Sequence, residues 1–262
     1  MNQNSQLNKK IEKEDFMKKL LLNEKIFLED KNVFIFIISI PIEIGIDELK
    51  QYTYILDSEE VKQFNKYKIE KKQIEFLIGR ILLKGILGKV FKKNAREISF
   101  SKNKYGKLYL SNQPHGLNLN FNLSHTDGKL VCGITRVGRL GIDVENTEID
   151  YLELMEMFFL PKEISYVNSQ SDFKNRKNLF YQIFTRKEAY MKLIGKGFSL
   201  SPFTFTVPLC KDVNPNEDIL YYSFNPSAGY MLSVAVEKID KNQEVIFNKN
   251  YLQIEQLIPL IV

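Results

Sequence analysis

The chain has 262 residues, which is long enough for one large domain or two smaller ones, each with its own core. Hydrophobic residues make up 44% and charged residues 26%, so the composition is that of a globular protein and excludes a disordered or fibrous one. The net charge of +5 suits an anionic ligand or an acidic partner, but it is too small to indicate nucleic-acid binding. With two cysteines and two histidines, a disulfide framework and metal sites built from several Cys or His side chains are excluded.

The first 32 residues are rich in Lys, Asn and Glu, and we predict that they form a partly helical N-terminal extension. This segment lacks the apolar core and the cleavage site of a signal peptide. The longest apolar run, Val33 to Ile38, is too short to span a bilayer, and its β-branched and aromatic residues are typical of a buried strand. We therefore expect a cytoplasmic protein that does not enter a membrane.

A core-facing helix is predicted over Glu70 to Leu87, because its apolar residues recur with helical spacing and Gly88 can end it. A hairpin follows, with its turn at Asn103 to Gly106. Leu117 to Ser124 then alternates strictly between apolar and polar residues, which predicts a strand with one polar face. Short amides and a hydroxyl on that face indicate a polar cleft.

Two further strands are expected at Leu130 to Thr135 and Leu140 to Glu145, on either side of Val137-Gly138-Arg139. Helices are expected between Asp150 and Ile194, and the last strands at 203–209, 219–224 and 230–236. The order of strand, helices and strands thus occurs twice. We predict an α+β fold of two similar lobes, an N-terminal lobe over 33–137 and a C-terminal lobe over 138–262.

Asp143 and Glu145 lie two residues apart on a predicted strand, so both side chains project from the same face. They are close enough to converge on one cation, and Mg²⁺ is often held by one or two carboxylates together with substrate phosphates. The alternative, two exposed acids on an edge strand, is the more frequent arrangement for such a pair considered alone.

Glu188 and Lys192 lie four residues apart on a predicted helix and share a face. Such pairs are common as solvated ion pairs, but the apolar neighbours of this one predict a largely buried helix, where charged groups are more informative. His125 follows the polar strand directly, after Ser124. A functional role and an ordinary surface role are equally compatible with that position.

Three of these segments, in order, resemble the signatures of the larger, surfactin-synthetase-activating type of 4′-phosphopantetheinyl transferase. They are Phe121 to His125, Gly141 to Glu145 and Phe184 to Lys192. Tyr105-Gly106-Lys107 and the Phe158 to Glu163 region are similar to lesser marks of the family. Glu75 and Leu108 depart from its pattern, since the family often has a basic residue at the first position and Pro at the second.

The resemblance implies two lobes related by a pseudo-twofold axis, with coenzyme A in the cleft between them. It implies that Asp143, Glu145 and Glu188 hold Mg²⁺ with the coenzyme A pyrophosphate. Ser124 and His125 would meet the 3′-phosphate side of the ligand. The remaining basic contacts to its phosphates would come from three side chains: Lys107, Lys187 and Lys192.

The implied reaction is attack by a serine hydroxyl of an apo acyl or peptidyl carrier protein on the β-phosphate of coenzyme A, with release of 3′,5′-ADP. Lys192 would stabilise the leaving phosphate, and either Glu188 or a metal-bound water would accept the serine proton. The alternatives are a non-catalytic paralogue that binds coenzyme A or a carrier, and a different Mg²⁺-dependent phosphotransferase. A chain that encloses its own cleft is expected to be a monomer.

Overall fold

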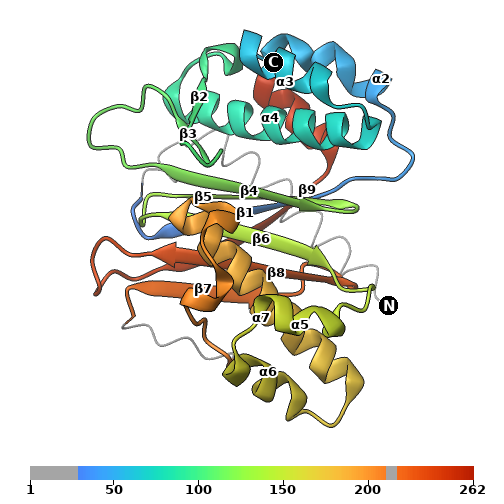
Figure 1. The fold of residues 1–262 in the computed structure, drawn as a ribbon. Coiled ribbons are helices and arrows are strands. Elements are labelled where there is room, and N and C mark those ends of the chain that lie inside the picture. Colours follow the sequence, from blue (N-terminus) through green and yellow to red (C-terminus); the bar gives the residue numbers. More distant parts are fainter. Residues whose placement is uncertain (1–28, 211–216) are drawn as a thin grey trace, which may run out of the picture.

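The computed structural model describes residues 29–210 and 217–262, in which two sheets are stacked between helices (Figure 1). Residues 1–28, which make up most of the predicted N-terminal extension, lie outside the described residues. The last residue of that predicted extension, Asn32, already begins the first strand. In the part of the chain that the structure describes, every helix is too short or too polar to cross a bilayer.

The first lobe begins with β1 and continues to the end of β5. Its elements are β1 (Asn32–Ser39), α2 (Ile46–Leu49), α3 (Ser58–Lys66), α4 (Glu70–Phe91), β2 (Phe100–Lys102), β3 (Leu108–Leu110), β4 (Asn120–Thr126) and β5 (Lys129–Thr135). The second lobe contains β6 (Leu140–Asn146), α5 (Met155–Phe158), α6 (Pro161–Asn168), α7 (Phe173–Ile194), β7 (Ile219–Phe224) and β8 (Tyr230–Glu237). The chain ends with β9 (Ile246–Leu252) and α8 (Ile258–Ile261).

The first sheet has the strand order β4-β5-β1-β9, and the second has the order β6-β8-β7. Only β9 runs parallel to its neighbour in these sheets, with Asn32 opposite Ile246. This pairing corrects the predicted boundary of the second lobe, 138–262, because β9 and α8 return to the first lobe. Leu257 and Leu260 are buried there, in the core that covers α4.

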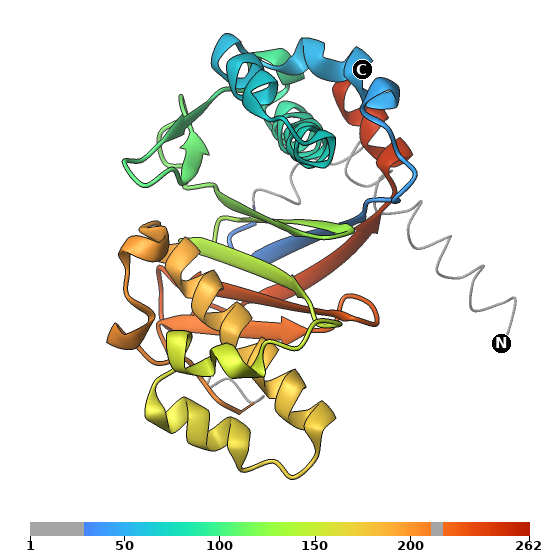
Figure 2. The same ribbon diagram turned by 45° about the vertical axis from the view of Figure 1, so that its right-hand side comes forward.

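Residues 33–38 of β1 are all apolar because both faces of the strand are covered. Val33, Ile35 and Ile37 pack against the second sheet, whereas Phe34 and Phe36 pack beneath α4. The two sheets therefore share one core between them. Figure 2 shows the resulting order of layers, with α4 on the outer side of the first sheet and α7 on the outer side of the second.

The two lobes are each built on one 22-residue helix, α4 in the first and α7 in the second. This arrangement confirms the predicted α+β fold of two similar lobes. α7 ends at Ile194, where the helical region was predicted to end, and Gly195 follows it with a left-handed φ of 76°. α4 instead continues through Gly88 to Phe91, and Lys92 takes the left-handed conformation. Gly88 is needed for another reason, since a Cβ there would lie 2.9 Å from the Lys93 carbonyl oxygen.

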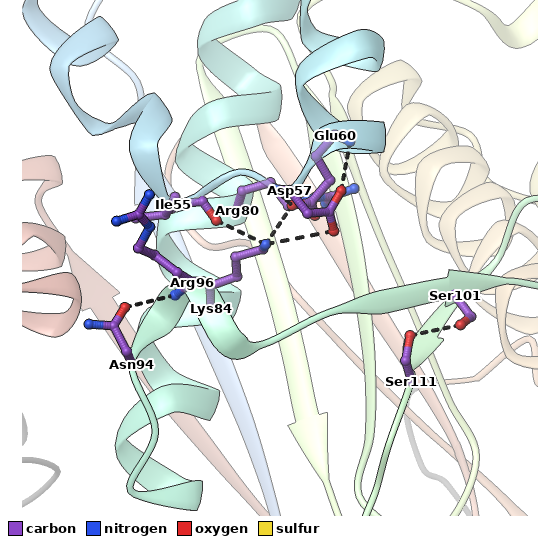
Figure 3. Close-up of polar contacts among 9 residues, drawn as sticks. All are labelled: Ile55, Asp57, Glu60, Arg80, Lys84, Asn94, Arg96, Ser101 and Ser111. Carbon is purple, nitrogen blue, oxygen red and sulfur yellow. Dashed lines mark hydrogen bonds and ion pairs between the residues drawn. The ribbon is translucent and has the colours of Figure 1, made fainter.

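A buried group of charges joins α3 to α4 beneath the hairpin (Figure 3). Glu60 forms ion pairs with Arg80 at 2.7 Å and with Lys84 at 2.5 Å, and Lys84 also donates to the Ile55 carbonyl oxygen. The Lys84 side chain has no exposed surface. Phe76 and Phe100 lie against the guanidinium of Arg80. Each charge thus has a partner, as burial in an apolar environment requires.

The strand predicted over 203–209 is wrong, because this segment makes no sheet pairing in the described chain. Backbone carbonyls of the segment and of its two flanking residues are instead bound by two buried cations of α7. Lys187 donates to the carbonyl oxygens of Pro202 and Phe205, and Arg186 donates to those of Pro208 and Cys210. The apolar alternation of the segment reflects packing on α7 rather than a place in the sheet.

Candidate functional site

The edge strands of the two sheets, β4 and β6, lie against each other, and we call this contact the seam. β4 presents alternate side chains to the two lobes. Phe121 and Leu123 pack in the first-lobe core, whereas Asn122 and Ser124 point across the seam. Asn122 Oδ1 accepts a hydrogen bond of 3.0 Å from the backbone N–H of Ile142. The amide row predicted as a cleft lining thus also holds the two sheets together.

The acidic face of β6 is turned toward α7. Ile142 packs between the two sheets, so Gly141, Asp143 and Glu145 occupy the opposite face, as the alternation predicts. A Cβ at Gly141 would lie only 1.9 Å from the Ala189 carbonyl oxygen of α7. Glycine at this position allows the helix to approach the strand closely. That approach brings the side chains of α7 to the carboxylates of β6.

Asp143 is the centre of a three-residue contact at the seam. Its Oδ1 accepts from Ser124 Oγ at 3.0 Å and from Lys192 Nζ at 2.7 Å, and Lys192 Nζ is also 2.7 Å from Ser124 Oγ. Asp143 is only 3% exposed. Lys192 pairs with Asp143 rather than with Glu188, so the solvated i,i+4 ion pair considered above does not describe this helix face. β4, β6 and α7 each contribute one residue to the contact.

Glu145 and Glu188 share the electrostatic environment of Asp143. Burial, together with the charges of Asp143 and Glu188, raises the pKa of Glu145 to about 8, although Lys192 and a hydrogen bond with Thr126 oppose the shift. Burial and the Asp143 charge raise the pKa of Glu188 to about 7, again opposed by Lys192. The three carboxylates thus interact electrostatically, with Asp143 acting on both glutamates. Their negative charge exceeds what the single ammonium of Lys192 can balance.

The donor set has the chemistry of a site for a hard divalent cation. Asp143 Oδ2 is buried and has no hydrogen-bond partner in the structure, so one of its oxygens is available as a ligand. Carboxylate oxygens are the protein ligands that Mg²⁺ prefers. Among the described residues, no three His, Cys, Asp or Glu side chains are already arranged around a common ion position. The residues fit a cation through the chemistry of their oxygens and through their excess negative charge, although the side chains do not surround one ion position.

His125 points to the other side of β4, toward α4. Its Nδ1 is 3.2 Å from Glu75 Oε2, and the same oxygen is 2.8 Å from Lys72 Nζ. Burial lowers the pKa of His125, whereas the Glu75 carboxylate opposes that shift. Ser124 and His125 both border a cavity of about 220 Å³. It is lined by Tyr67, Lys72, Glu75, Phe76, Gly79, Arg80, Leu123, Ser124, His125 and Leu130.

Two predicted phosphate-binding lysines lie away from the seam contact. Lys107 donates to the carbonyl oxygens of Leu140 and Leu193 at 3.0 and 2.9 Å, so it joins the hairpin to the start of β6 and the end of α7. Burial, with the charge of Arg139 adding to it, lowers the pKa of Lys107 to about 8. Lys187 is buried against Glu163 at 2.9 Å. Neither ammonium contacts Asp143, so their role toward a ligand stays a prediction.

Three polar residues of this region make contacts that the sequence did not predict. Asn122 ties the sheets, Thr126 supports Glu145, and Glu75 holds His125. The two-residue period of the strand predicts on which face each of its polar side chains lies. Asn122, Ser124 and Thr126 fall on one face, and His125 falls on the other. Glu75 stood out only as a departure from the family pattern, and its contact with His125 joins residues 50 positions apart.

Two family models match the chain, one in each lobe. Residues 45–136 match the N-terminal region of 4′-phosphopantetheinyl transferases, and residues 139–238 match the 4′-phosphopantetheinyl transferase superfamily. The second match contains the strand with Asp143 and Glu145 and the helix with Glu188 and Lys192. The boundary between the matches falls in the short connection between β5 and β6.

Individual relatives lead to the same family. The 4′-phosphopantetheinyl transferase HetI of Nostoc sp. is 30% identical over 162 residues, which cover 61% of this chain and 68% of the relative. The transferase gsp of Aneurinibacillus migulanus is 29% identical over 70% of this chain and 73% of its own. Sfp of Bacillus subtilis is 30% identical over 52% of this chain and 58% of its own. With both lobes matched and the shared segments converging at one seam, the chain belongs to the 4′-phosphopantetheinyl transferases of the Sfp-like type.

Proposed function

We propose that this protein transfers the 4′-phosphopantetheine arm of coenzyme A to a serine of an apo acyl or peptidyl carrier protein, in a Mg²⁺-dependent reaction. The observation that supports this best is the contact of Ser124, Asp143 and Lys192 at the seam. It unites all three segments that resemble the family signatures. The presence of every acidic residue of the implied site, and of Lys192, does not favour a paralogue without catalytic function.

In this proposal Asp143, Glu145 and Glu188 hold Mg²⁺ together with the pyrophosphate of coenzyme A. The cation, when bound, neutralises phosphate charge that would otherwise repel the incoming hydroxyl. The unpartnered Oδ2 of Asp143 and the raised pKa values of the other two carboxylates support the assignment. The raised pKa values come mainly from burial, with the charges of the neighbouring carboxylates adding to it, and a bound cation would lower both values.

The serine Oγ of the carrier forms a bond to the β-phosphorus, and the bond from that phosphorus to the bridging oxygen breaks. The leaving group is 3′,5′-ADP. Lys192 is suited to donate a hydrogen bond to the phosphate on which charge grows, since its ammonium already lies at the seam, 28% exposed. Glu188 or a water that it orients accepts the serine proton. A pKa of about 7 suits a group that exchanges protons near neutral pH.

The nucleotide end of coenzyme A would lie in the cavity beside His125 and Ser124. His125 and Lys72 supply its basic groups at the opening, where each side chain is nearly half exposed. For Lys107 and Lys187 we propose a supporting role, because both ammonium groups are engaged with backbone carbonyl oxygens. They would hold the hairpin and α7 around the ligand rather than bind its phosphates.

The proposal is tested by incubating the protein with coenzyme A, Mg²⁺ and a panel of apo carrier proteins, followed by mass spectrometry of each carrier. We expect a gain of one phosphopantetheine mass on at least one carrier, and its loss when Mg²⁺ is removed with EDTA. Asp143→Asn should abolish the gain while the variant remains folded. If no carrier of the fatty-acid, polyketide or nonribosomal-peptide classes gains mass, the proposed transfer is incorrect.

A further inference from the structure

Glu75 lies where α4 passes behind β4, under the cavity assigned to the nucleotide. It is a buried acid in contact with two basic side chains, since its Oε2 is 2.8 Å from Lys72 Nζ and 3.2 Å from His125 Nδ1. A carboxylate at a position proposed to bind a phosphate could act in two opposite ways. It could repel the anion, or it could hold the groups that bind it.

The exposures of the three side chains favour the second action. The Glu75 side chain is 2% exposed, whereas those of Lys72 and His125 are 44% and 45% exposed. The carboxylate is therefore almost closed to solvent, whereas both of its partners are accessible to an anion at the cavity. Because Lys72 already balances its charge at close range, the net effect of Glu75 on an entering anion is weaker than its sign alone implies.

The contact between Glu75 and His125 involves one particular nitrogen of the imidazole ring. Nδ1 is the ring nitrogen that faces the carboxylate, at 3.2 Å from Glu75 Oε2. The second ring nitrogen, Nε2, lies on the far side of the imidazole from Glu75. Burial lowers the pKa of His125 and the Glu75 carboxylate opposes that shift, so the carboxylate helps the ring to keep the second hydrogen with which Nε2 can donate to a phosphate oxygen. A carboxylate that orients a histidine through the nitrogen away from the ligand is a common arrangement at metal sites.

We propose that Glu75 is a positioning residue, which orients His125 and Lys72 as a pair that binds the 3′-phosphate of coenzyme A. This inference rests on the proposed function, because it assigns a residue to the same ligand. Glu75 thereby determines selectivity for a nucleotide with a terminal phosphate on its ribose, without touching that phosphate itself. The residue that departs from the family pattern would thus contribute to recognition through its two neighbours.

The test compares the affinities of two nucleotides that differ only in that group, adenosine 3′,5′-bisphosphate and AMP, by calorimetry on the full chain. Glu75→Gln keeps the size of the side chain and removes its charge. We expect it to weaken bisphosphate binding about tenfold, the scale of one charge-assisted hydrogen bond, and to leave AMP binding unchanged. Glu70→Gln removes the same charge from the exposed first turn of α4 and serves as the matched control.

A second readout follows the ring itself. The chain contains two histidines, so the imidazole ¹⁵N resonances of His125 can be assigned by comparison with a His115→Asn variant. With the bisphosphate bound, the wild-type resonances should be those of a ring protonated at both nitrogens, and Glu75→Gln should change them. In a His125→Ala background, Glu75→Gln should have a smaller effect than in the wild type, because its partner is gone.

Tighter bisphosphate binding by Glu75→Gln would instead show that the carboxylate repels the phosphate, and equal losses for both nucleotides would show that it only supports the fold. Either result overturns the inference, as does wild-type protein that binds the two nucleotides equally. If Glu75→Gln does not fold, Glu75→Asp supplies the comparison with the charge kept and the reach shortened. Nucleotide selectivity that depends on Glu75, without modification of any carrier, would contradict the proposed transfer but not the positioning role.

Discussion

Glu188 is the residue for which a structural and a catalytic role differ most in their consequences. It lies near Asp143 and makes no ion pair with Lys192, so removing its charge takes no buried salt bridge from the fold. We expect Glu188→Gln to reduce transfer by about two or more decades, the usual scale for a lost acid or base. Carrier mass gain measured against time gives the rate, and thermal melting checks the fold.

Glu156→Gln is a suitable control for this substitution, because Glu156 is an exposed acid of the same lobe. It should leave both the rate and the melting temperature unchanged. Raising the Mg²⁺ concentration should recover part of the Glu188→Gln loss if the side chain acts mainly as a ligand, and little if it acts mainly as a base. A Glu188→Gln variant with normal turnover would remove Glu188 from the proposed site.

At the level of single residues, the strand period placed Asp143 and Glu145 on one face, and the helix period placed Glu188 and Lys192 on another. That the two pairs lie in one site was implied only by the family resemblance. The strand period also separates Ser124 from His125, which the family resemblance places together. Ser124 and His125 are adjacent on a strand, so they point to opposite faces and enter different contacts. The burial of Lys187 against Glu163 could not be predicted, because the chain between them is a loop followed by most of a helix.

Among the elements, α3 and α4 depend on Glu60. Glu60→Gln would leave Lys84 and Arg80 buried without a full counter-charge. Removing one partner of a buried ion pair destabilises a protein strongly, so we expect unfolding free energy to fall by about 3 kcal/mol. Urea denaturation followed by circular dichroism measures this change.

The neighbouring Glu59 provides the matched control, since its side chain is 79% exposed and pairs only with the solvated Lys62. Glu59→Gln should change the unfolding free energy by less than about 1 kcal/mol. Equal effects of the two substitutions would mean that the buried charges contribute no more than a surface pair does.

The hairpin depends on Lys107, whose pKa of about 8 lies below its ordinary value because the ammonium is buried. In the unfolded chain this lysine keeps its proton to higher pH. Between about pH 8 and pH 10 the unfolded state therefore binds more protons, and the contribution of Lys107 makes stability rise with pH. Lys107→Met should remove this contribution. The measurement is the unfolding free energy of both proteins at several pH values in that range, and parallel pH profiles would contradict the expected sign.

Helices and strands with strong local patterns were predicted well, and those fixed by distant contacts were not. The alternation in β4 and the apolar spacing of α4 reflect faces that each element buries on its own. The end of α4 could not be predicted from Gly88, because this glycine is needed where the backbone of Lys93 passes close to the helix. The segment 203–209 has strand-like composition, but the buried cations Arg186 and Lys187 bind carbonyl oxygens within it. Such competition cannot be seen in the segment itself.

For the whole molecule, the last elements of the chain are part of the first lobe. A chain that ends after Glu244 would lack β9 and α8. Their loss would expose one edge of β1 and one face of α4. We expect this truncated protein to be largely unfolded or aggregated, as measured by gel filtration and circular dichroism, rather than merely less active. A soluble, cooperatively melting truncated protein would show that these elements are dispensable.

The parallel pairing of β1 with β9 has a consequence for synthesis. About 210 residues separate the two strands, so the partner of β1 is made long after β1 itself. At bacterial and eukaryotic elongation rates this interval is roughly 10 to 40 s. During that time a strand that is apolar on both faces has an open edge, and such edges promote association between chains. The nascent protein should therefore depend on chaperones until its final turn of helix leaves the ribosome.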